Sequence, residues 1–196
     1  MKNVLIIGGT ARSANKIINA LENNQYSINL MTFRQKSKIY GNYNWIELDL
    51  ENDISVTNFI KSLPKNFYSK IIFLSGNSLS KKYIDINKDE LKHFYNSYIY
   101  NYNQIIIECM ESINENGEII FVSSIAANRP INDVHYSAAK AANQALVKSL
   151  SLYTKNNQCI YSIAPGTIDE NILSEIIKII VYSNKDNNGK VFEVGY

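Results

Sequence analysis

The chain has few of the residues that would mark it as a disulfide-stapled or metal-binding protein. It contains two cysteines, two histidines, three prolines and one tryptophan among 196 residues. Cys109 and Cys159 lie in apolar surroundings without a paired spacing, which predicts two reduced, buried thiols. His93 and His135 have no neighbouring ligand residue at a useful spacing, so we expect no metal site.

Long apolar runs and a strong net charge are also missing. The apolar run at the N-terminus stops after a few residues at Gly8 and Gly9, too early for a signal peptide or a membrane span. The formal net charge of +2 is too small to indicate a nucleic acid or a membrane surface as partner. We therefore expect a cytoplasmic protein that binds neither.

Short apolar runs alternate with longer amphipathic stretches along the chain. This alternation predicts an α/β fold, in which a doubly wound parallel sheet is covered by helices on both faces and residues 1–196 form a single domain. The expected strands cover residues 3–8, 27–33, 45–48, 70–75, 117–123, 159–164 and 190–194. The expected helices cover residues 12–23, 53–62, 88–114, 135–155 and 169–183.

The first expected strand runs directly into the turn GGTARSA, which begins at Gly8. A glycine turn between a strand and a helix is where backbone N–H groups meet the phosphates of a dinucleotide. The spacing G-x-x-x-G-x-G would need glycines where the chain has Arg12 and Ala14. Alanine allows close packing and a guanidinium fits beside a phosphate. This loop alone leaves open both a nucleotide site and a plain turn.

Five motifs, taken in order, resemble the short-chain dehydrogenase/reductase family. They are the glycine turn at 8–14, LSGNS at 74–78, VSSIA at 122–126, YSAAK at 136–140 and IAPGTI at 163–168. The resemblance covers residues 2 to about 170 and returns in NGKVFEVGY at the end of the chain. Y-x-x-x-K alone is a weak signal, but a serine pair before it and Pro-Gly after the next strand make the combination specific.

The resemblance implies a catalytic Ser–Tyr–Lys set with a supporting asparagine. Tyr136 and Lys140 match it directly, and their spacing puts both side chains on one face of a helix. Ser123 and Ser124 both remain open as the serine. We favour Ser124, because small residues follow it. Asn96 matches the asparagine by its separation from Ser124. Two other residues of the same expected helix, Asn101 and Asn103, are weaker candidates.

These residue types suit the reduction of a carbonyl, which needs a hydride and a proton. The ordinary pKa of tyrosine, about 10, makes it a poor acid–base at neutral pH. A nearby Lys140 ammonium and an oxidised nicotinamide are expected to lower the pKa of Tyr136, which would then donate the proton. Ser124 would polarise the carbonyl. Asn96 would position a water near Lys140.

The resemblance also implies that the cofactor is NADP(H) or NAD(H). NAD preference usually goes with an acidic residue at the end of the second strand, whereas this chain has Arg34, Lys36 and Lys38 there. Cations suit a 2′-phosphate, which favours NADP(H) over NAD(H). The residues that the resemblance assigns to the cofactor are Gly8, Gly9, Thr10, Arg12, Ser13, Ala14, Arg34, Asp49, Leu50, Ser75, Gly76, Asn77, Tyr136, Lys140, Pro165, Gly166, Thr167 and Ile168.

The implied activity is an NAD(P)(H)-dependent interconversion of a carbonyl and an alcohol, on a small-molecule or carrier-presented substrate. Only residues 167–196 follow Gly166, so most of the family's substrate lid is expected to be missing. Two alternatives therefore stay open, a dinucleotide-binding partner or sensor protein with reduced catalysis, and an epimerase or dehydratase without net redox change. The resemblance also implies a homodimer or homotetramer, assembled through the helices at 88–114 and 135–155.

Overall fold

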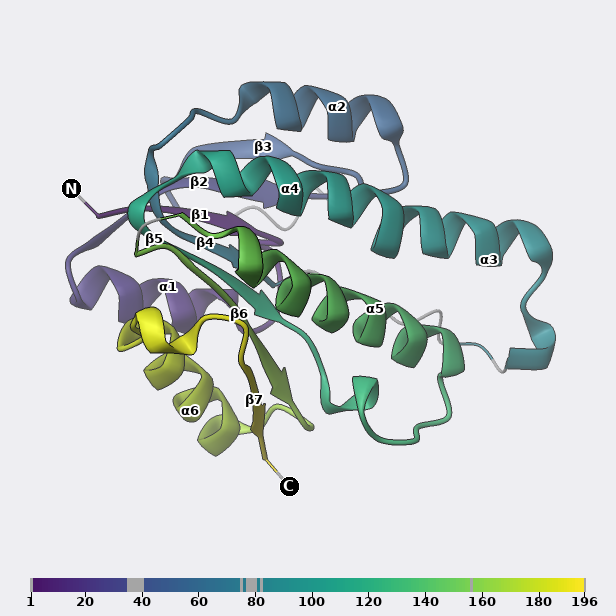
Figure 1. The fold of residues 1–196 in the computed structure, drawn as a ribbon. Helices are drawn as coiled ribbons and strands as arrows, with labels where there is room; N and C mark the ends of the chain where they lie inside the picture. Colours follow the sequence, from purple (N-terminus) through teal and green to yellow (C-terminus); the bar gives the residue numbers. More distant parts are fainter. Residues whose placement is uncertain are drawn as a thin grey trace.

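A seven-stranded sheet forms the centre of the protein (Figure 1). The computed structural model describes residues 2–34, 41–74, 76, 81, 83–155 and 157–195. The strand order is β3-β2-β1-β4-β5-β6-β7, and every pairing is parallel, which confirms the predicted α/β doubly wound fold. The strands are β1 (Lys2–Ile7), β2 (Tyr26–Phe33), β3 (Trp45–Glu47), β4 (Tyr68–Phe73), β5 (Ile113–Val122), β6 (Cys159–Pro165) and β7 (Val191–Val194).

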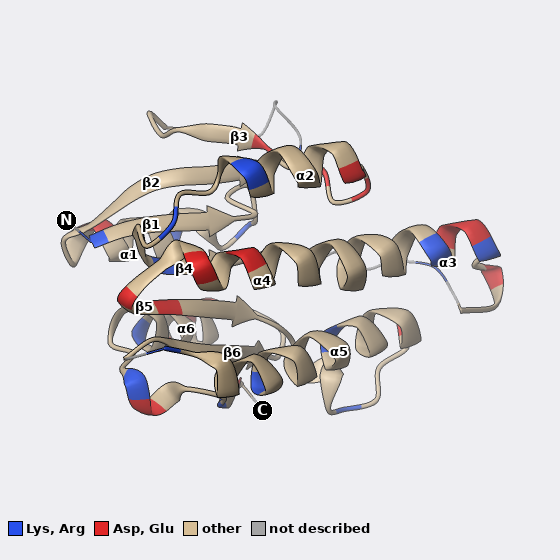
Figure 2. Ribbon diagram, turned by 45° about the horizontal axis from the view of Figure 1, so that its top comes forward, with Lys and Arg blue, Asp and Glu red and all other residues tan. Residues whose placement is uncertain are grey.

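Helices cover both faces of the sheet. Helices α1 and α6 pack on one face, and α2, α4 and α5 pack on the other (Figures 1 and 2). The α-helices are α1 (Ala14–Asn23), α2 (Asp53–Ser62), α3 (Lys88–Tyr95), α4 (Tyr102–Ser112), α5 (Val134–Leu150) and α6 (Glu170–Val181). The short helical segments are η2 (Tyr83–Asp85), the π-helical η3 (Asn96–Asn101), η4 (Ile125–Ala127), η5 (Ser151–Tyr153) and η6 (Lys185–Asn187).

The apolar run of β1 shows why the sheet needs both helix layers. Val4 and Ile6 belong to the core against α1 and α6, whereas Leu5 and Ile7 belong to the core against α2, α4 and α5. Successive side chains of a strand point to opposite faces, so a strand covered on both sides is apolar throughout. None of the described helices combines the length and apolar character needed to cross a membrane.

The predicted helix at 88–114 and strand at 117–123 have the wrong boundary. Helix α4 ends at Ser112 and β5 begins at Ile113, which pairs with Tyr68 of β4. A Cβ on Gly117 would lie 2.7 Å from the Ile113 Cβ, so the chain folds closely on itself at this point. The irregular start of β5 breaks the alternation from which a strand is recognised, and the pattern therefore located only its regular second half.

The helical segment at 88–112 is also not uniform. Its start is fixed locally by a reciprocal capping box between Asn87 and Glu90. Residues Asn96–Asn101 then form a π-helical turn, which widens the helix before α4 continues. This turn lies between α2 and α5 and rotates the side chains that follow it relative to a regular helix.

Candidate active site

A cavity of about 310 Å³ lies at the carboxyl ends of β1, β2, β3 and β4. Open α/β sheets bind their ligands at this edge. The volume is at the lower end of the range for small-molecule sites. The predicted cofactor residues that line the cavity are Gly8, Thr10, Arg12, Arg34, Asp49, Leu50 and Gly76.

The glycine turn has the backbone geometry that a phosphate site requires. Gly8 has a φ of 87°, a conformation that other residues rarely adopt, and its N–H donates to Thr32 Oγ1 over 2.8 Å. A Cβ on Gly9 would lie 3.0 Å from the Met31 Cβ. Ser13 precedes α1 but makes no side-chain capping bond, and in the first turn the Ala14 N–H donates to the Ala11 carbonyl oxygen over 3.0 Å. No side chain therefore competes with an anion for the next N–H groups of this turn. Ala14 is buried beneath this turn.

Arg34 lies at the cavity between two carboxylates. Its Nη2 is 2.7 Å from Glu51 Oε2, and its Nε is 3.4 Å from Asp49 Oδ1. Burial acts to lower the pKa of Arg34, but Glu51 and Asp49 outweigh it and the pKa is raised. Arg12 also lines the cavity and forms no ion pair within the described part of the chain. Lys36 and Lys38 lie outside the described residues.

The structure brings Ser124, Tyr136 and Lys140 together at the carboxyl end of β5. Ser124 follows β5, whereas Tyr136 and Lys140 lie in the first two turns of α5, with Asp133 Oδ1 capping the helix through the Tyr136 N–H at 3.0 Å. Ser124 Oγ accepts a hydrogen bond of 3.1 Å from the Ala126 N–H, and the Ser124 side chain lies close enough to Tyr136 to act on its pKa. The preceding serine, Ser123, instead accepts a hydrogen bond of 3.1 Å from Gln144 Nε2 and is buried.

The pKa of Tyr136 is raised, whereas the sequence predicts that it is lowered. Burial is the largest cause, the Asp133 charge adds to it, and the Ser124 hydrogen bond opposes it. Lys140 lies close, with Nζ 5.5 Å from the centroid of the Tyr136 ring, and its pKa of about 8 leaves it mostly charged at neutral pH. In the protein by itself, desolvation of the phenolate therefore outweighs the attraction of the neighbouring cation.

Lys140 is deeply buried, with 5% of its surface exposed. Burial alone lowers its pKa to about 8. Within the described residues the only acceptor for its Nζ is the Val122 carbonyl oxygen, at 3.5 Å, and the Phe121 ring centroid lies 5.5 Å away. A Cβ on Gly76 would lie 2.5 Å from Nζ. A glycine at position 76 thus leaves the space that the ammonium occupies.

Asn96 lies on the other side of its helix from this group. Its Nδ2 is 3.2 Å from Asp53 Oδ1 on α2. Asn101 also faces α2, with Nδ2 at 2.8 Å from the Leu50 carbonyl oxygen and 3.0 Å from Asp53 Oδ1. The structure therefore does not bring the Asn96 side chain to Lys140, and the water-positioning role stays a prediction.

The segment after β6 lies on the far side of Ser124. The Gly166 N–H donates to the Val194 carbonyl oxygen over 2.8 Å, and a Cβ on Gly166 would lie 3.5 Å from Ile125 Cδ1. Residues Pro165 to Ile168 thus flank the Ser–Tyr–Lys group, and Thr167 and Ile168 lead into α6. Two further predicted cofactor residues, Ser75 and Asn77, lie outside the described residues.

Two residues of the site were missed by sequence reasoning. Glu51 meets Arg34 at the cavity, and Asn143 lies one helical turn after Lys140. An acidic residue two positions after Asp49 is a signal that could have drawn attention to Glu51. For Asn143, the i, i+3 spacing from Lys140 on a helix was the available signal.

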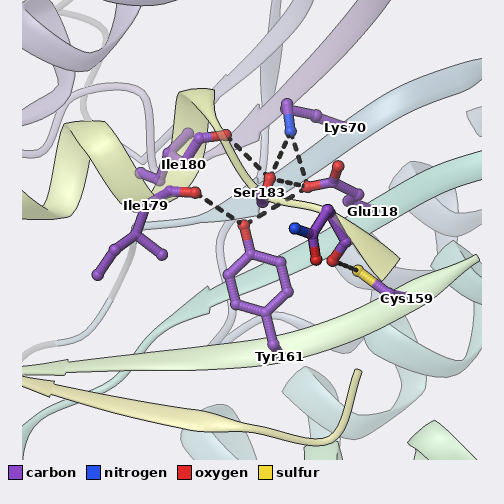
Figure 3. A network of polar contacts seen from close by, with 8 residues as sticks. Lys70, Glu118, Cys159, Tyr161, Ile179, Ile180 and Ser183 are labelled. Carbon is purple, nitrogen blue, oxygen red and sulfur yellow. Dashed lines mark hydrogen bonds and ion pairs between the residues drawn. The ribbon is translucent and has the colours of Figure 1, made fainter. Parts of the chain in front are cut away.

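A second buried lysine, Lys70, lies toward the opposite end of the sheet (Figure 3). Its Nζ is 2.7 Å from Glu118 Oε2 and 2.9 Å from Ser183 Oγ. Ser183 also bonds Glu118, and the Tyr161 hydroxyl lies 3.5 Å from the same carboxylate oxygen. Burial lowers the pKa of Lys70, and Glu118 opposes that effect. This lysine is part of a closed network that ties β4, β5 and β6 to the end of α6.

The glycine turn, the cavity beside it and the Ser–Tyr–Lys group define a doubly wound protein with a nucleotide-type site. A family model described as Enoyl-(Acyl carrier protein) reductase matches residues 14–187. The chain belongs to the short-chain dehydrogenase/reductase family. No curated protein matches the chain at a significant level.

Solved structures share the fold at low sequence identity. A short-chain dehydrogenase family protein from Francisella tularensis is 18% identical with a TM-score of 0.82, covering 98% of this chain and 96% of that one. BdcA in complex with NADPH is 15% identical with a TM-score of 0.80, covering 98% and 92%. A 4-hydroxyisoleucine dehydrogenase complexed with NADH and succinate is 18% identical with a TM-score of 0.79, covering 97% and 96%. At these identities the likeness shows the fold.

Proposed function

We propose that this protein is an NADP(H)-dependent oxidoreductase that interconverts a carbonyl and an alcohol. The observation that carries the proposal is the meeting of Ser124, Tyr136 and Lys140 beside the cavity that the glycine turn lines. Membership of the short-chain dehydrogenase/reductase family supports it. The NADPH and NADH in two structures of the same fold support a nicotinamide cofactor.

Each of the three side chains has a separate task in this reaction. A bound nicotinamide cofactor supplies or accepts the hydride. Tyr136 donates the proton to the carbonyl oxygen during reduction and accepts it during oxidation. The Ser124 hydroxyl, which lies beside Tyr136, polarises the same carbonyl oxygen. Lys140 supplies the positive charge that favours the Tyr136 phenolate.

The residues around the cavity fit a dinucleotide. The Gly8 turn and the uncapped start of α1 suit its phosphates, and Asp49 and Leu50 suit the adenosine end. Arg12 and Arg34 favour NADP(H), because a 2′-phosphate binds well to guanidinium groups. Glu51 already holds Arg34, so a 2′-phosphate must compete with this carboxylate. We expect Glu51→Gln to tighten NADPH binding more than NADH binding, measured by cofactor titration.

The connection that could cover the substrate side of the site is short. The chain passes from the end of β6 at Pro165 to the start of α6 at Glu170 with only residues 166–169 between them. A lid this short fits a carbonyl that a larger molecule or a carrier presents, as well as a small-molecule carbonyl. The description of the matching family model, which names an acyl carrier protein, favours the carrier-presented class.

We also propose that the protein is a homodimer or homotetramer assembled through the α3–η3–α4 and α5 helices. Tyr100 and Ile107 are 58% and 55% exposed on the first of these, and Val134 is 46% exposed at the start of α5. Apolar side chains on neighbouring helices suit a subunit contact. Light scattering after size exclusion tests this, and a monomer across the micromolar range would contradict it.

The central experiment is a cofactor titration followed by an assay of carbonyl compounds. Fluorescence or thermal shift should detect NADPH, and a panel of free and carrier-linked carbonyls should show oxidation of NADPH. Tyr136→Phe should retain cofactor binding and lose turnover by about 10²–10⁴-fold. Tyr153→Phe, which removes a hydroxyl from an exposed residue of η5, is the matched control and should keep full activity.

The outcomes separate the candidate functions. Cofactor binding without turnover of any compound would favour a binding or sensor protein. Failure to bind NADPH and NADH would overturn the proposed function altogether.

A further inference from the structure

A small cavity lies directly beside the proposed catalytic lysine. It has a volume of about 10 Å³, and Lys140, Asn143 and Tyr136 are among the residues that line it. A single buried water needs roughly 10–15 Å³ on this measure, and two or more polar partners. The cavity is therefore about the size of one water molecule, and it has polar atoms on its walls.

The Asn143 amide forms a hydrogen bond through its nitrogen but, among the described residues, none through its oxygen. The residue is 3% exposed, and its Nδ2 donates to the Tyr98 carbonyl oxygen over 3.1 Å. Its Oδ1 is buried, and no donor among the described residues reaches it. A buried amide oxygen without a donor destabilises the fold, because it has lost its hydrogen bond to water. A donor in the cavity would remove that cost.

Lys140 has more N–H donors than acceptors among the described residues. Its ammonium carries three N–H groups, and within the described chain it meets one carbonyl oxygen, that of Val122, at 3.5 Å. No direct hydrogen bond joins it to Asn143 in the described structure, although both line the same cavity. A water between them would accept from Lys140 and donate to Asn143, which satisfies both groups at once.

We propose that Asn143 is a positioning residue, which holds a water molecule against Lys140 Nζ in this cavity. The proposal rests on the proposed function and moves to Asn143, on α5, the task that the family resemblance implies for Asn96. Asn96 cannot reach this cavity with its side chain while its amide bonds Asp53. The water gives the ammonium an acceptor that the described residues do not supply at this point, and so keeps Lys140 charged beside Tyr136.

The surroundings of Lys140 make this acceptor important. The titratable groups that line the cavity with it are Tyr98 of η3, Tyr102 of α4 and Tyr136 of α5. No carboxylate of the described chain lines it. Burial alone lowers the pKa of Lys140 to about 8, so above neutral pH, where the Tyr136 phenolate forms, its charge depends on the few acceptors it has.

The first test is a high-resolution crystal structure of the protein. We expect an ordered water at about 3 Å from both Lys140 Nζ and Asn143 Oδ1. In Asn143→Leu, which removes the acceptor and keeps the branched shape of the side chain, this water should be lost. A well-resolved cavity without the water in the wild-type protein would overturn the site itself, whether or not the protein turns over a substrate.

The second test is the pH dependence of alcohol oxidation. Loss of the water should leave Lys140 less charged and raise the pKa of Tyr136, so in Asn143→Leu the rising limb of kcat should move to higher pH. A displacement of about one pH unit, with a roughly tenfold lower kcat at neutral pH, is expected. KM for the cofactor should stay within about twofold, since Asn143 holds the water and not the cofactor.

Two further variants separate positioning from packing. Asn143→Ser keeps an uncharged oxygen acceptor at this position and should bring the limb back toward that of the wild type. Ser137→Ala removes another buried oxygen that lacks a partner in the described chain, also on α5 but outside the cavity, and should leave the limb unchanged. If Asn143→Leu turns over substrate as fast as the wild type and its limb is unshifted, the role of Asn143 is overturned but the proposed function is not. A wild-type protein that oxidises no alcohol and reduces no carbonyl overturns the proposed function, and the role of Asn143 in it.

Discussion

Two lysines are buried at opposite ends of the same sheet, and their surroundings differ. Lys70 is 1% exposed and has a carboxylate and a hydroxyl within 2.9 Å. Lys140 is 5% exposed and has one carbonyl oxygen at 3.5 Å among the described residues. Burial disfavours the charge of both. Within the described parts of the chain, Lys70 has a carboxylate partner and Lys140 has none.

The difference separates a structural lysine from a proposed catalytic one. A buried ion pair needs its partner and its hydrogen bonds within the fold, as Lys70 has them in Glu118 and Ser183 (Figure 3). A buried lysine without a partner is kept at a cost, which is typical of a group whose partner arrives with the ligand or the substrate. The comparison predicts that mutations at the two lysines will affect different properties.

The largest expected effect is on activity at Lys140. Lys140→Met should lower kcat by about 10²–10³-fold, because the Tyr136 phenolate loses its neighbouring cation. The free energy of unfolding should stay the same or rise, since the variant removes a buried charge that has no carboxylate partner in the described chain. Steady-state kinetics and urea denaturation measure the two quantities. A large loss of stability with normal kcat would reverse the comparison.

At Lys70 the expected effect is on stability. Lys70→Met leaves the Glu118 carboxylate without its cation, which should destabilise the fold by about 3 kcal/mol in urea denaturation while kcat stays within twofold. Adding Glu118→Leu should recover most of this loss. The exposed pair Lys16–Glu170 provides the control, since Lys16→Met should cost less than about 1 kcal/mol. Equal losses at Lys70 and Lys16 would show that burial does not matter here.

The pH dependence of stability should also reveal the lowered pKa of Lys140. Its pKa is about 8 in the folded protein and that of ordinary lysine when unfolded, so between these values the unfolded chain binds the extra proton. Stability should therefore rise with pH through this window, by about 2 kcal/mol between pH 8 and 9.5, relative to Lys140→Met. Urea denaturation of both proteins at each pH measures the difference. Parallel curves for the two proteins would contradict the lowered pKa.

The smallest effect on stability is expected at Gly76. The Cβ of Gly76→Ala would meet the end of the flexible Lys140 side chain, which can move at a cost below about 1 kcal/mol. A displaced ammonium should nevertheless lower kcat about tenfold or more. Gly117→Ala is the contrasting variant, because its Cβ would meet the Ile113 Cβ and backbone atoms of Asn114. It should reduce the melting temperature and leave kcat unchanged.

The sequence predicted the sheet and its helices well because a parallel sheet covered on both faces needs continuous apolar strands. Its errors came where regular periodicity stops. The start of β5 at Ile113 and the π-turn at Asn96–Asn101 interrupt the alternating and helical patterns from which elements are recognised. Boundaries of this kind depend on strand pairing, which no local pattern contains.

The sequence also located Tyr136 and Lys140, because a fixed helical spacing places them on one face. It could not decide between Ser123 and Ser124. In the structure the Ser124 side chain lies beside Tyr136, whereas Ser123 accepts a hydrogen bond from Gln144, and this difference favours Ser124. It could not foresee that Glu51 would hold Arg34, since the two residues meet only when the sheet is assembled.

What the sequence by itself determined is therefore the family, the order of the elements and the pair of side chains on α5. Those properties follow from local periods and spacings along one chain. Only the tertiary structure decided which lysine has a carboxylate partner, toward which helix Asn96 turns, and what Lys140 meets in the core. These depend on residues far apart in the sequence, such as Lys70, Glu118 and Ser183, whose distances are set by packing.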